Sequence, residues 1–191
     1  MKLEKASYEI WDEKIPFHDH IERCGRICYA SEPVGGEKAV EFCNRLIKSG
    51  HLSVLEHGTI YLSMNSETEE SLKYDENPYS EYYDNDEFEL GQACIVTNLR
   101  TLIENRWMDD LQYACEPTPY HDKRITVKWN VNRAIANEIV RHRKFSYSQQ
   151  STRYCNFSKN KFGNELTFII LSWIDENVIM KEFGGVNGLS Y

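Results

Sequence analysis

Hydrophobic positions recur at helical spacing in three segments of the chain. The segments 20–30, about 37–49 and 133–143 each have one apolar face, so we predict three amphipathic helices. The apolar positions are Ile21, Cys24, Ile27 and Cys28 in the first segment, Val40, Phe42, Cys43, Leu46 and Ile47 in the second, and Ile135, Ile139 and Val140 in the third. Gly50 follows the second segment at the position of a C-terminal glycine cap.

Alternation of apolar and polar residues predicts strands elsewhere. TIYLSM (59–64) would place Ile60, Leu62 and Met64 on one face of a strand. ACIVT (93–97) and KRITVKWNV (123–131) predict two further strands, and Asn98 is a candidate N-cap for a helix that extends to Trp107. Residues 1–14 are predicted to form an edge strand or an arm, and LTFIILSWI (166–174) fits a buried strand or a short helix equally well.

The segment 65–90 has a different composition. It is rich in carboxylates and poor in aliphatic residues, which predicts an exposed excursion from the core. Its tyrosines are the side chains expected to anchor part of it. No internal repeat is visible along the chain.

Composition narrows the function classes. The 191 residues suffice for one domain, and the 41% hydrophobic content is typical of a globular protein. A net charge of −8 argues against a general nucleic-acid or membrane-surface binder, although a local cluster of cations could still hold a small anion. The sequence contains no apolar run of about 18 residues and no signal-peptide pattern, so we expect a cytoplasmic protein. Its six cysteines are expected to be reduced thiols.

A local cluster of cations occurs in the segment RHRKFSYSQQSTRY (141–154). Cations at a helix C-terminus interact favourably with the helix dipole, and this alone could account for Arg141, Arg143 and Lys144. The alternative is an anion site in which a Glu138–Arg141 pair holds one guanidinium in place. Composition leaves both interpretations open. We expect no metal site, because His18, His20, Cys24 and Cys28 lack a common zinc-ligand spacing.

Three sequence blocks carry a resemblance to a known family. Arg141, His142 and Arg143, followed after seven residues by Ser151, resemble the signature of the flavin-dependent thymidylate synthases. SGHLSVLEHGTIYLSM (49–64) resembles the Gly-His…Glu-His segment of that family, and CGRICYAS (24–31) is a weaker third block. No glycine-rich phosphate loop is present, so FAD would not be bound by a dinucleotide fold.

The resemblance implies a fold, a reaction and an assembly. The fold would be α+β, with a central, mostly antiparallel sheet packed by helices. The reaction would make dTMP from dUMP, with a methylene group from 5,10-methylenetetrahydrofolate and with FAD and NADPH as the reducing system. The family also implies a homotetramer whose sites form where subunits meet, with no nucleic-acid or membrane partner.

The resemblance also assigns residues by matching position. Contacts to FAD are expected from His51, Ser53, Arg141, His142, Arg143 and Gln149. Contacts to dUMP are expected from Glu138, Ile139, Val140, Arg141, Gln149, Gln150, Ser151, Thr152 and Arg153. The catalytic residues would be Arg141, Ser151 and Arg153. We expect Ser151 to donate a hydrogen bond rather than to act as a nucleophile, because the sequence shows no base beside it.

Two departures from the family pattern are visible. We predict a single domain over 1–191 in which about 65–130 is a peripheral insertion between the strand at 59–64 and the helix of the RHR motif. The family continues beyond the region that matches 160–175 with further flavin- and nucleotide-binding residues, whereas no arginine follows Arg153 here. The alternative function is therefore an inactive or split subunit that binds nucleotide or flavin.

Overall fold

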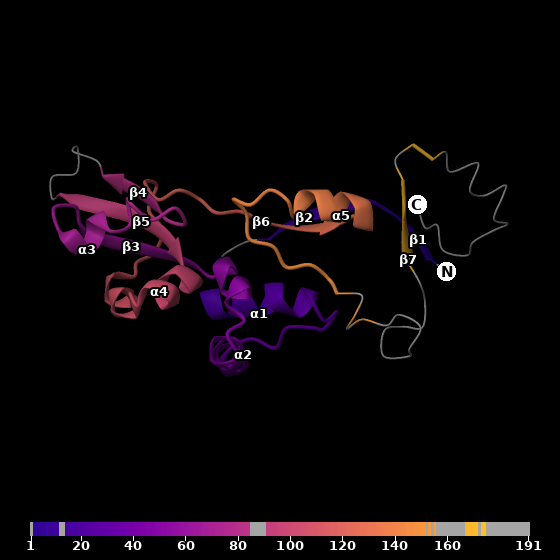
Figure 1. Cartoon of the computed structure of the whole chain (residues 1–191), viewed down its shortest axis with the longest axis horizontal. Coiled ribbons are helices and arrows are strands. Elements are labelled where there is room, and N and C mark those ends of the chain that lie inside the picture. Colours follow the sequence, from indigo (N-terminus) through magenta and orange to yellow (C-terminus); the bar gives the residue numbers. More distant parts are fainter. Residues whose placement is uncertain are drawn as a thin grey trace. The chain divides into compact units, whose positions relative to one another are not determined.

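The computed structural model describes residues 2–11, 14–84, 91–151, 153, 155, 167–171, 173 and 174. Helices and strands are mixed along the chain, and most strand pairs are antiparallel, so the predicted α+β class is confirmed (Figure 1). The strands are β1 (Lys2–Lys5), β2 (Ser7–Trp11), β3 (Thr59–Asn65), β4 (Glu81–Asp84), β5 (Gln92–Asn98), β6 (Thr126–Asn130) and β7 (Thr167–Ile170). The α-helices are α1 (Phe17–Ile27), α2 (Glu37–Lys48), α3 (Glu69–Leu72), α4 (Leu99–Asn105) and α5 (Arg133–Ile139), and the 3₁₀ helices are η1 (Leu52–His57) and η2 (Met108–Tyr113).

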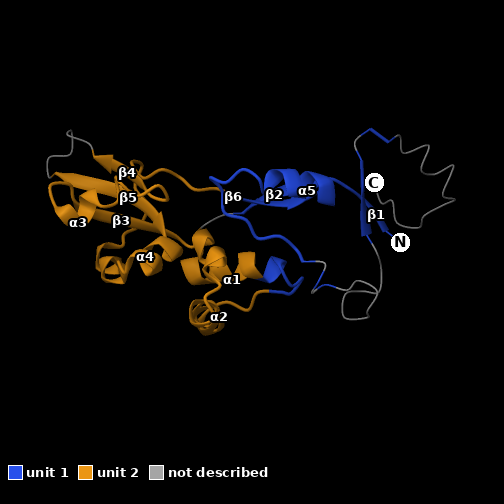
Figure 2. Cartoon of the chain, viewed as in Figure 1, with its two compact units in different colours: residues 1–12, 26–32, 126–191 blue, residues 13–25, 33–125 orange. Residues whose placement is uncertain are grey.

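The chain divides into two compact units (Figure 2). Unit 1 contains residues 1–12, 26–32 and 126–191, and unit 2 contains residues 13–25 and 33–125.

Unit 2 is built around an antiparallel sheet of strand order β3-β5-β4. β3 pairs with β5 along its whole length, from Thr59 opposite Asn98 to Asn65 opposite Gln92. Ile60, Leu62 and Met64 are all buried, which confirms the face predicted from the alternation in β3. Since every second side chain of a strand points to the same face, these three residues enter one core.

The central strand β5 and the helix after it supply much of this core. Ala93 to Leu99 are buried without interruption, as expected for a strand covered on both faces. The Asn98 side chain accepts a hydrogen bond from the Thr101 backbone N–H at 3.0 Å, so the predicted N-cap of α4 is confirmed. The helix ends at Asn105, two residues before the predicted end, because Arg106 adopts a left-handed conformation with φ 61°.

The helix α2 confirms the predicted amphipathic segment, but its buried face begins at Ala39 and not at the predicted Val40. Ala39 is fully buried, whereas Val40 is 39% exposed. The buried row is Ala39, Phe42 and Cys43, with half-buried Leu46 completing the i, i+3, i+4, i+7 spacing. In α1, Ile21 and Cys24 are buried as predicted, whereas Ile27 at its C-terminal end and Cys28 just after it are only half-buried.

The C-terminus of α2 ends in a glycine cap, as predicted. Gly50 has φ 72°, and its N–H donates to the Ile47 carbonyl at 3.1 Å. The His51 N–H donates to the Leu46 carbonyl at 2.9 Å. These two bonds form a Schellman motif, which favours glycine because the residue must be left-handed.

Tyr74 anchors the acidic segment 65–84. Tyr74 is fully buried, and its hydroxyl donates to Asp110 at 2.7 Å. Lys73 pairs with the same carboxylate at 2.6 Å and lies over the Trp107 ring. The predicted tyrosine anchor is therefore confirmed for this part, while residues 85–90 lie outside the described residues.

Unit 1 contains two two-stranded sheets. β2 and β6 pair antiparallel, and β1 and β7 pair parallel. Residues 1–14 thus contribute two strands, and the segment that fitted a strand or a helix is a strand over Thr167–Ile170. The described strands form three sheets, whereas the resemblance implied one central sheet. At β3, the edge away from β5 is partly taken by residues 114 and 115, since Leu62 bridges to Ala114 and the Cys115 N–H donates to the Tyr61 carbonyl.

Two further expectations concern the whole chain. All six cysteines are free. Within the described ranges, no helix has the length and apolar character needed to cross a bilayer.

We expect unit 2 to lose stability as the pH falls from about 7 to 5. Burial lowers the pKa of both His18 and His20 below the usual 6.5. The unfolded chain therefore binds protons in this range that the folded chain does not, and the free energy of unfolding decreases toward low pH. Urea unfolding at several pH values measures the effect. A His20→Gln variant should show a shallower dependence, and an unfolding midpoint that rises on acidification would contradict the prediction.

Candidate functional site

The cationic segment begins where α5 ends. Asn132 caps the helix by accepting the Ile135 N–H at 3.1 Å. The helix was predicted over 133–143, but it ends at Ile139. The next N–H groups bond at three-residue spacing, from Arg141 to the Glu138 carbonyl and from His142 to the Ile139 carbonyl. This tight turn places Arg141, His142 and Arg143 in the exposed loop after the helix.

The predicted Glu138–Arg141 pair is confirmed. Arg141 Nη1 lies 3.1 Å from Glu138 Oε2, and the two side chains are 72% and 66% exposed. Solvent screening makes such a pair worth little for stability. The pair occupies one nitrogen of the guanidinium, which has further N–H donors.

An aromatic side chain fastens the turn after the helix. The Tyr147 hydroxyl donates to the His142 carbonyl at 3.1 Å, and the Tyr147 ring meets Phe145 edge-on. Burial raises the pKa of Tyr147 from its usual value of 10, and the hydroxyl is protonated at neutral pH with or without this shift. The backbone at His142 is therefore held by a contact five residues further on.

The segment 148–155 lies against the loop that follows α1. The Ser151 N–H donates to the Cys28 carbonyl at 3.1 Å, and Cys155 Sγ lies 3.7 Å from the same oxygen. Burial raises the pKa of the Cys28 thiol, while hydrogen bonds from Ser148 and the Gln149 backbone act in the opposite direction. The third sequence block, CGRICYAS (24–31), therefore contacts the end of the cationic segment, here called the RHR segment (141–155), through Cys28.

Ser151 is half-buried at the centre of this contact. Its Oγ accepts the Arg153 N–H at 3.3 Å, and its carbonyl accepts the Cys155 N–H at 2.9 Å. Accepting a hydrogen bond at Oγ uses a lone pair and not the hydroxyl hydrogen. This geometry suits the predicted role of Ser151 as a donor.

The other predicted residues of unit 1 differ in exposure. Gln149, Gln150 and Arg153 are exposed, and Ile139 and Val140 are half-buried. Thr152 lies outside the described residues. One segment therefore presents guanidinium, imidazole, amide and hydroxyl groups to solvent, and this donor set is suited to a phosphate or a carbonyl-bearing base.

The remaining predicted residues, His51 and Ser53, belong to unit 2 and are both exposed. His51 follows the glycine cap of α2, and Ser53 lies in η1. Gly58 follows η1 and packs so closely against α1 that a Cβ would lie 2.5 Å from Ile21 Cδ1. The glycine therefore allows η1 to approach the core. His51 and Ser53 thus belong to unit 2, whereas residues 138–153 belong to unit 1 (Figure 2).

Comparison with family models gives one match. Residues 105–184 match the model of the thymidylate synthase complementing protein, a range that contains the whole segment 138–153. The matched range is similar to that family. In the other two comparisons, no curated protein and no solved structure matches the chain.

This match agrees with the resemblance to a thymidylate synthase family that the sequence motifs indicated. The match begins at residue 105, so part of the predicted insertion lies inside it, whereas the block at 49–64 lies outside. The extent of the insertion and the likeness of that block remain predictions. Residues 92–105 of the predicted insertion nevertheless form β5 and α4, which contribute to the core of unit 2.

Two contacts, one in each unit, were not predicted from sequence. Cys28 was assigned to a buried helix face, but α1 ends at Ile27 and the Cys28 carbonyl holds Ser151 instead. Arg100 contacts Glu56 across 44 residues of sequence. The only available signal for Cys28 was the third block, and no sequence pattern pointed to Arg100.

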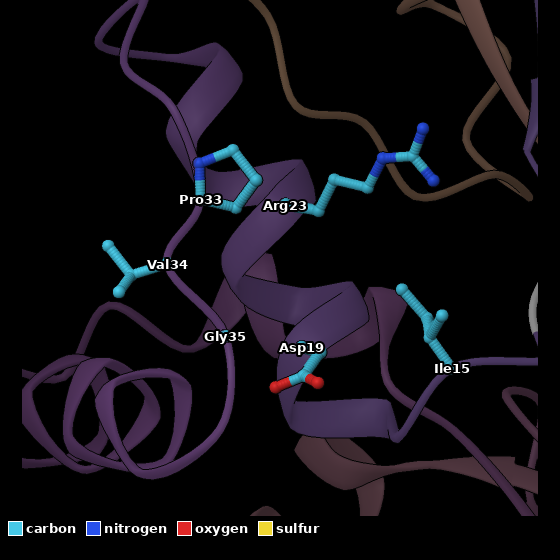
Figure 3. A pocket seen from close by; sticks show the side chains of 6 residues that line it. All are labelled: Ile15, Asp19, Arg23, Pro33, Val34 and Gly35. Carbon is cyan, nitrogen blue, oxygen red and sulfur yellow. The ribbon is translucent and has the colours of Figure 1, made fainter.

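A pocket of about 200 Å³ lies in unit 2, away from the predicted site residues in sequence. Its lining residues are Ile15, Asp19, Arg23, Pro33, Val34 and Gly35 (Figure 3). Asp19 Oδ1 accepts the Gly36 N–H at 2.8 Å, and buried Glu22 accepts the N–H groups of Val34 and Gly35. These carboxylates fix the α1–α2 loop. Among the described residues, no group of three His, Cys, Asp or Glu side chains could hold a metal ion.

Proposed function

We propose that this protein is a flavin-dependent thymidylate synthase that converts dUMP to dTMP. The family match over 105–184 carries the proposal, since it contains the cationic segment. The reaction transfers a methylene group from 5,10-methylenetetrahydrofolate to uracil C5, with loss of the C5 proton. FAD, reduced by NADPH, supplies the hydride that completes the methyl group. We further propose a cytoplasmic homotetramer with its sites at subunit interfaces.

The proposed nucleotide contacts come from the loop after α5. Arg141 and Arg153 would bind the phosphate and the uracil carbonyls, and the Ser151 hydroxyl would donate to the nucleotide. Glu138, Ile139, Val140, Gln149, Gln150 and Thr152 would complete the contacts. Donors fixed before the reaction stabilise charge that develops on the uracil without having to reorganise, which is usually a large contribution to catalysis. The Cys28–Ser151 contact would supply this fixation for Ser151, and the exposed Glu138–Arg141 pair would add a weaker restraint on Arg141.

The donor set also suits the flavin. His142 and Arg143 are exposed beside Arg141, and exposed Gln149 adds an amide. Guanidinium and imidazole groups fit the pyrophosphate of FAD, and an amide fits the edge of an isoalloxazine ring. His51 and Ser53 of unit 2 would contribute one imidazole and one hydroxyl. We propose these five residues, together with Arg141, as the flavin contacts.

Two measurements test the proposal. The visible spectrum of the purified full chain, before and after addition of FAD, reports flavin binding. Tritium release from dUMP labelled at C5, with FAD, NADPH and 5,10-methylenetetrahydrofolate present, reports turnover. Both signals are expected. Flavin or dUMP binding without tritium release would favour the alternative, an inactive or split binding subunit, and the absence of both signals would refute the proposal.

Replacing the serine of the signature separates two roles. We expect Ser151→Ala to lower kcat/KM for dUMP about fivefold while retaining turnover, since one hydrogen bond contributes about 1 kcal/mol. Steady-state kinetics and dUMP titration measure the two effects. Ser146→Ala, in the same segment but outside the predicted site, is the matched control. Complete loss of turnover with intact dUMP binding would contradict the donor role and indicate a nucleophile.

A further inference from the structure

An ion pair joins η1 to the start of α4 in unit 2. Arg100 Nη1 lies 2.5 Å from Glu56 Oε1, and Arg100 Nε lies 2.8 Å from Glu104 Oε1. The Arg100 and Glu56 side chains are only 35% and 26% exposed, so water screens this pair less than it screens the pair of Glu138 with Arg141. The Glu104 hydrogen bond, followed by that of Glu56, raises the pKa of Arg100.

A backbone hydrogen bond reinforces this junction. The Leu99 N–H, the first of α4, donates to the Gly58 carbonyl just after η1 at 3.0 Å. Asn98 caps the same helix end, so the Arg100 side chain projects from a fixed backbone. One rigid helix end therefore holds both the side chain of Glu56 and the backbone at Gly58.

The element held in this way needs external support. η1 is a 3₁₀ helix of six residues, and 3₁₀ hydrogen bonds have poorer geometry than those of an α-helix. It carries Ser53 and follows directly on His51, which are the two predicted flavin contacts of unit 2. The orientation of these exposed side chains therefore depends on the contacts that fasten η1 to its neighbours.

We propose that Arg100 is a positioning residue, which fixes η1 through Glu56 so that His51 and Ser53 are held ready for the flavin. This inference rests on the proposed function for the identity of the ligand. Glu56 links η1 to α4, because its carboxylate oxygen Oε1 contacts the guanidinium of Arg100. The α4 helix belongs to the predicted insertion, so this insertion supports the site and is not merely an appendage.

The test uses the full chain and two readouts. Arg100→Gln removes the charge while keeping a long polar side chain, and Glu104→Gln is the matched control because Glu104 contacts Arg100 but not η1. We expect Arg100→Gln to raise the Kd for FAD about tenfold, as for loss of one charge-assisted hydrogen bond. We also expect amide hydrogens of residues 52–58 to exchange about five- to tenfold faster, since local opening becomes easier. Glu104→Gln should change both values less than twofold.

A charge-swapped double variant distinguishes loss of the ion pair from a general folding defect. Arg100→Glu combined with Glu56→Arg should recover most of the FAD affinity that either single change removes. The inference is overturned if Arg100→Gln binds FAD like the wild type, or if Glu104→Gln has the same effect as Arg100→Gln. If the wild type itself binds no FAD, the proposed function fails, and hydrogen exchange still decides the positioning role. Unchanged exchange in residues 52–58 of Arg100→Gln would then refute it.

Discussion

Arg141→Lys should lower kcat/KM for dUMP by about 10²- to 10³-fold, which is the cost of removing one preorganised donor from a charged transition state. Arg141 is proposed to contact both dUMP and FAD, and Glu138 restrains its guanidinium at 3.1 Å. Lysine keeps the charge but lacks the planar fork that grips a phosphate or a carbonyl at two points. Steady-state kinetics with dUMP as the varied substrate, scored by tritium release, measures the effect.

The neighbouring cation provides the control for this experiment. Lys144 is exposed three residues after Arg141 but is not among the predicted contacts. Lys144→Ala should therefore leave kcat/KM within about threefold, because a surface charge acts at this distance through a screened field. Equal losses in the two variants would show that net positive charge, and not the Arg141 fork, attracts dUMP.

The parts of the fold that were predictable from sequence depend on short-range rules. The alternation in β3, the glycine cap at Gly50 and the N-cap at Asn98 each involve residues within a few positions of one another. Backbone geometry fixes such patterns directly, so they can be recognised without knowledge of the tertiary structure. The shift of the α2 stripe from Val40 to Ala39 shows the limit. Hydropathy favours the larger residue, whereas the packing geometry admits the small one at the centre of the contact.

In the candidate site too, local contacts were predictable from the sequence and long-range contacts were not. The Glu138–Arg141 pair follows from helical spacing, because residues three apart share a face. The contact of Cys28 with Ser151 joins residues more than a hundred positions apart, and it is made by a backbone carbonyl that any residue possesses. Side-chain identity therefore carries little information about it. The pairing of Arg100 with Glu56 is equally non-local.

Composition alone gives an incomplete picture of the predicted insertion at about 65–130. The carboxylates of the segment 65–90 predict exposure, and many of those described are exposed, while the strand predicted at 93–97 forms the centre of the unit 2 sheet. A few buried positions, including Tyr74 and the run from Ala93 to Leu99, decide the packing. Average composition over a long segment conceals such positions, because burial is a property of individual side chains.

Ile95→Ala is therefore expected to destabilise unit 2 by about 2–5 kcal/mol, the range for truncating a large buried aliphatic side chain. Ile95 is fully buried in β5, opposite Leu62 of β3 and Tyr82 of β4, so its removal leaves a cavity that both neighbours border. Urea unfolding measures the loss. Ile125→Ala is the matched control, since Ile125 is 68% exposed and the change should stay within about 0.5 kcal/mol. Similar values for the two variants would mean that β5 is not part of a packed core, and that the predicted insertion is peripheral after all.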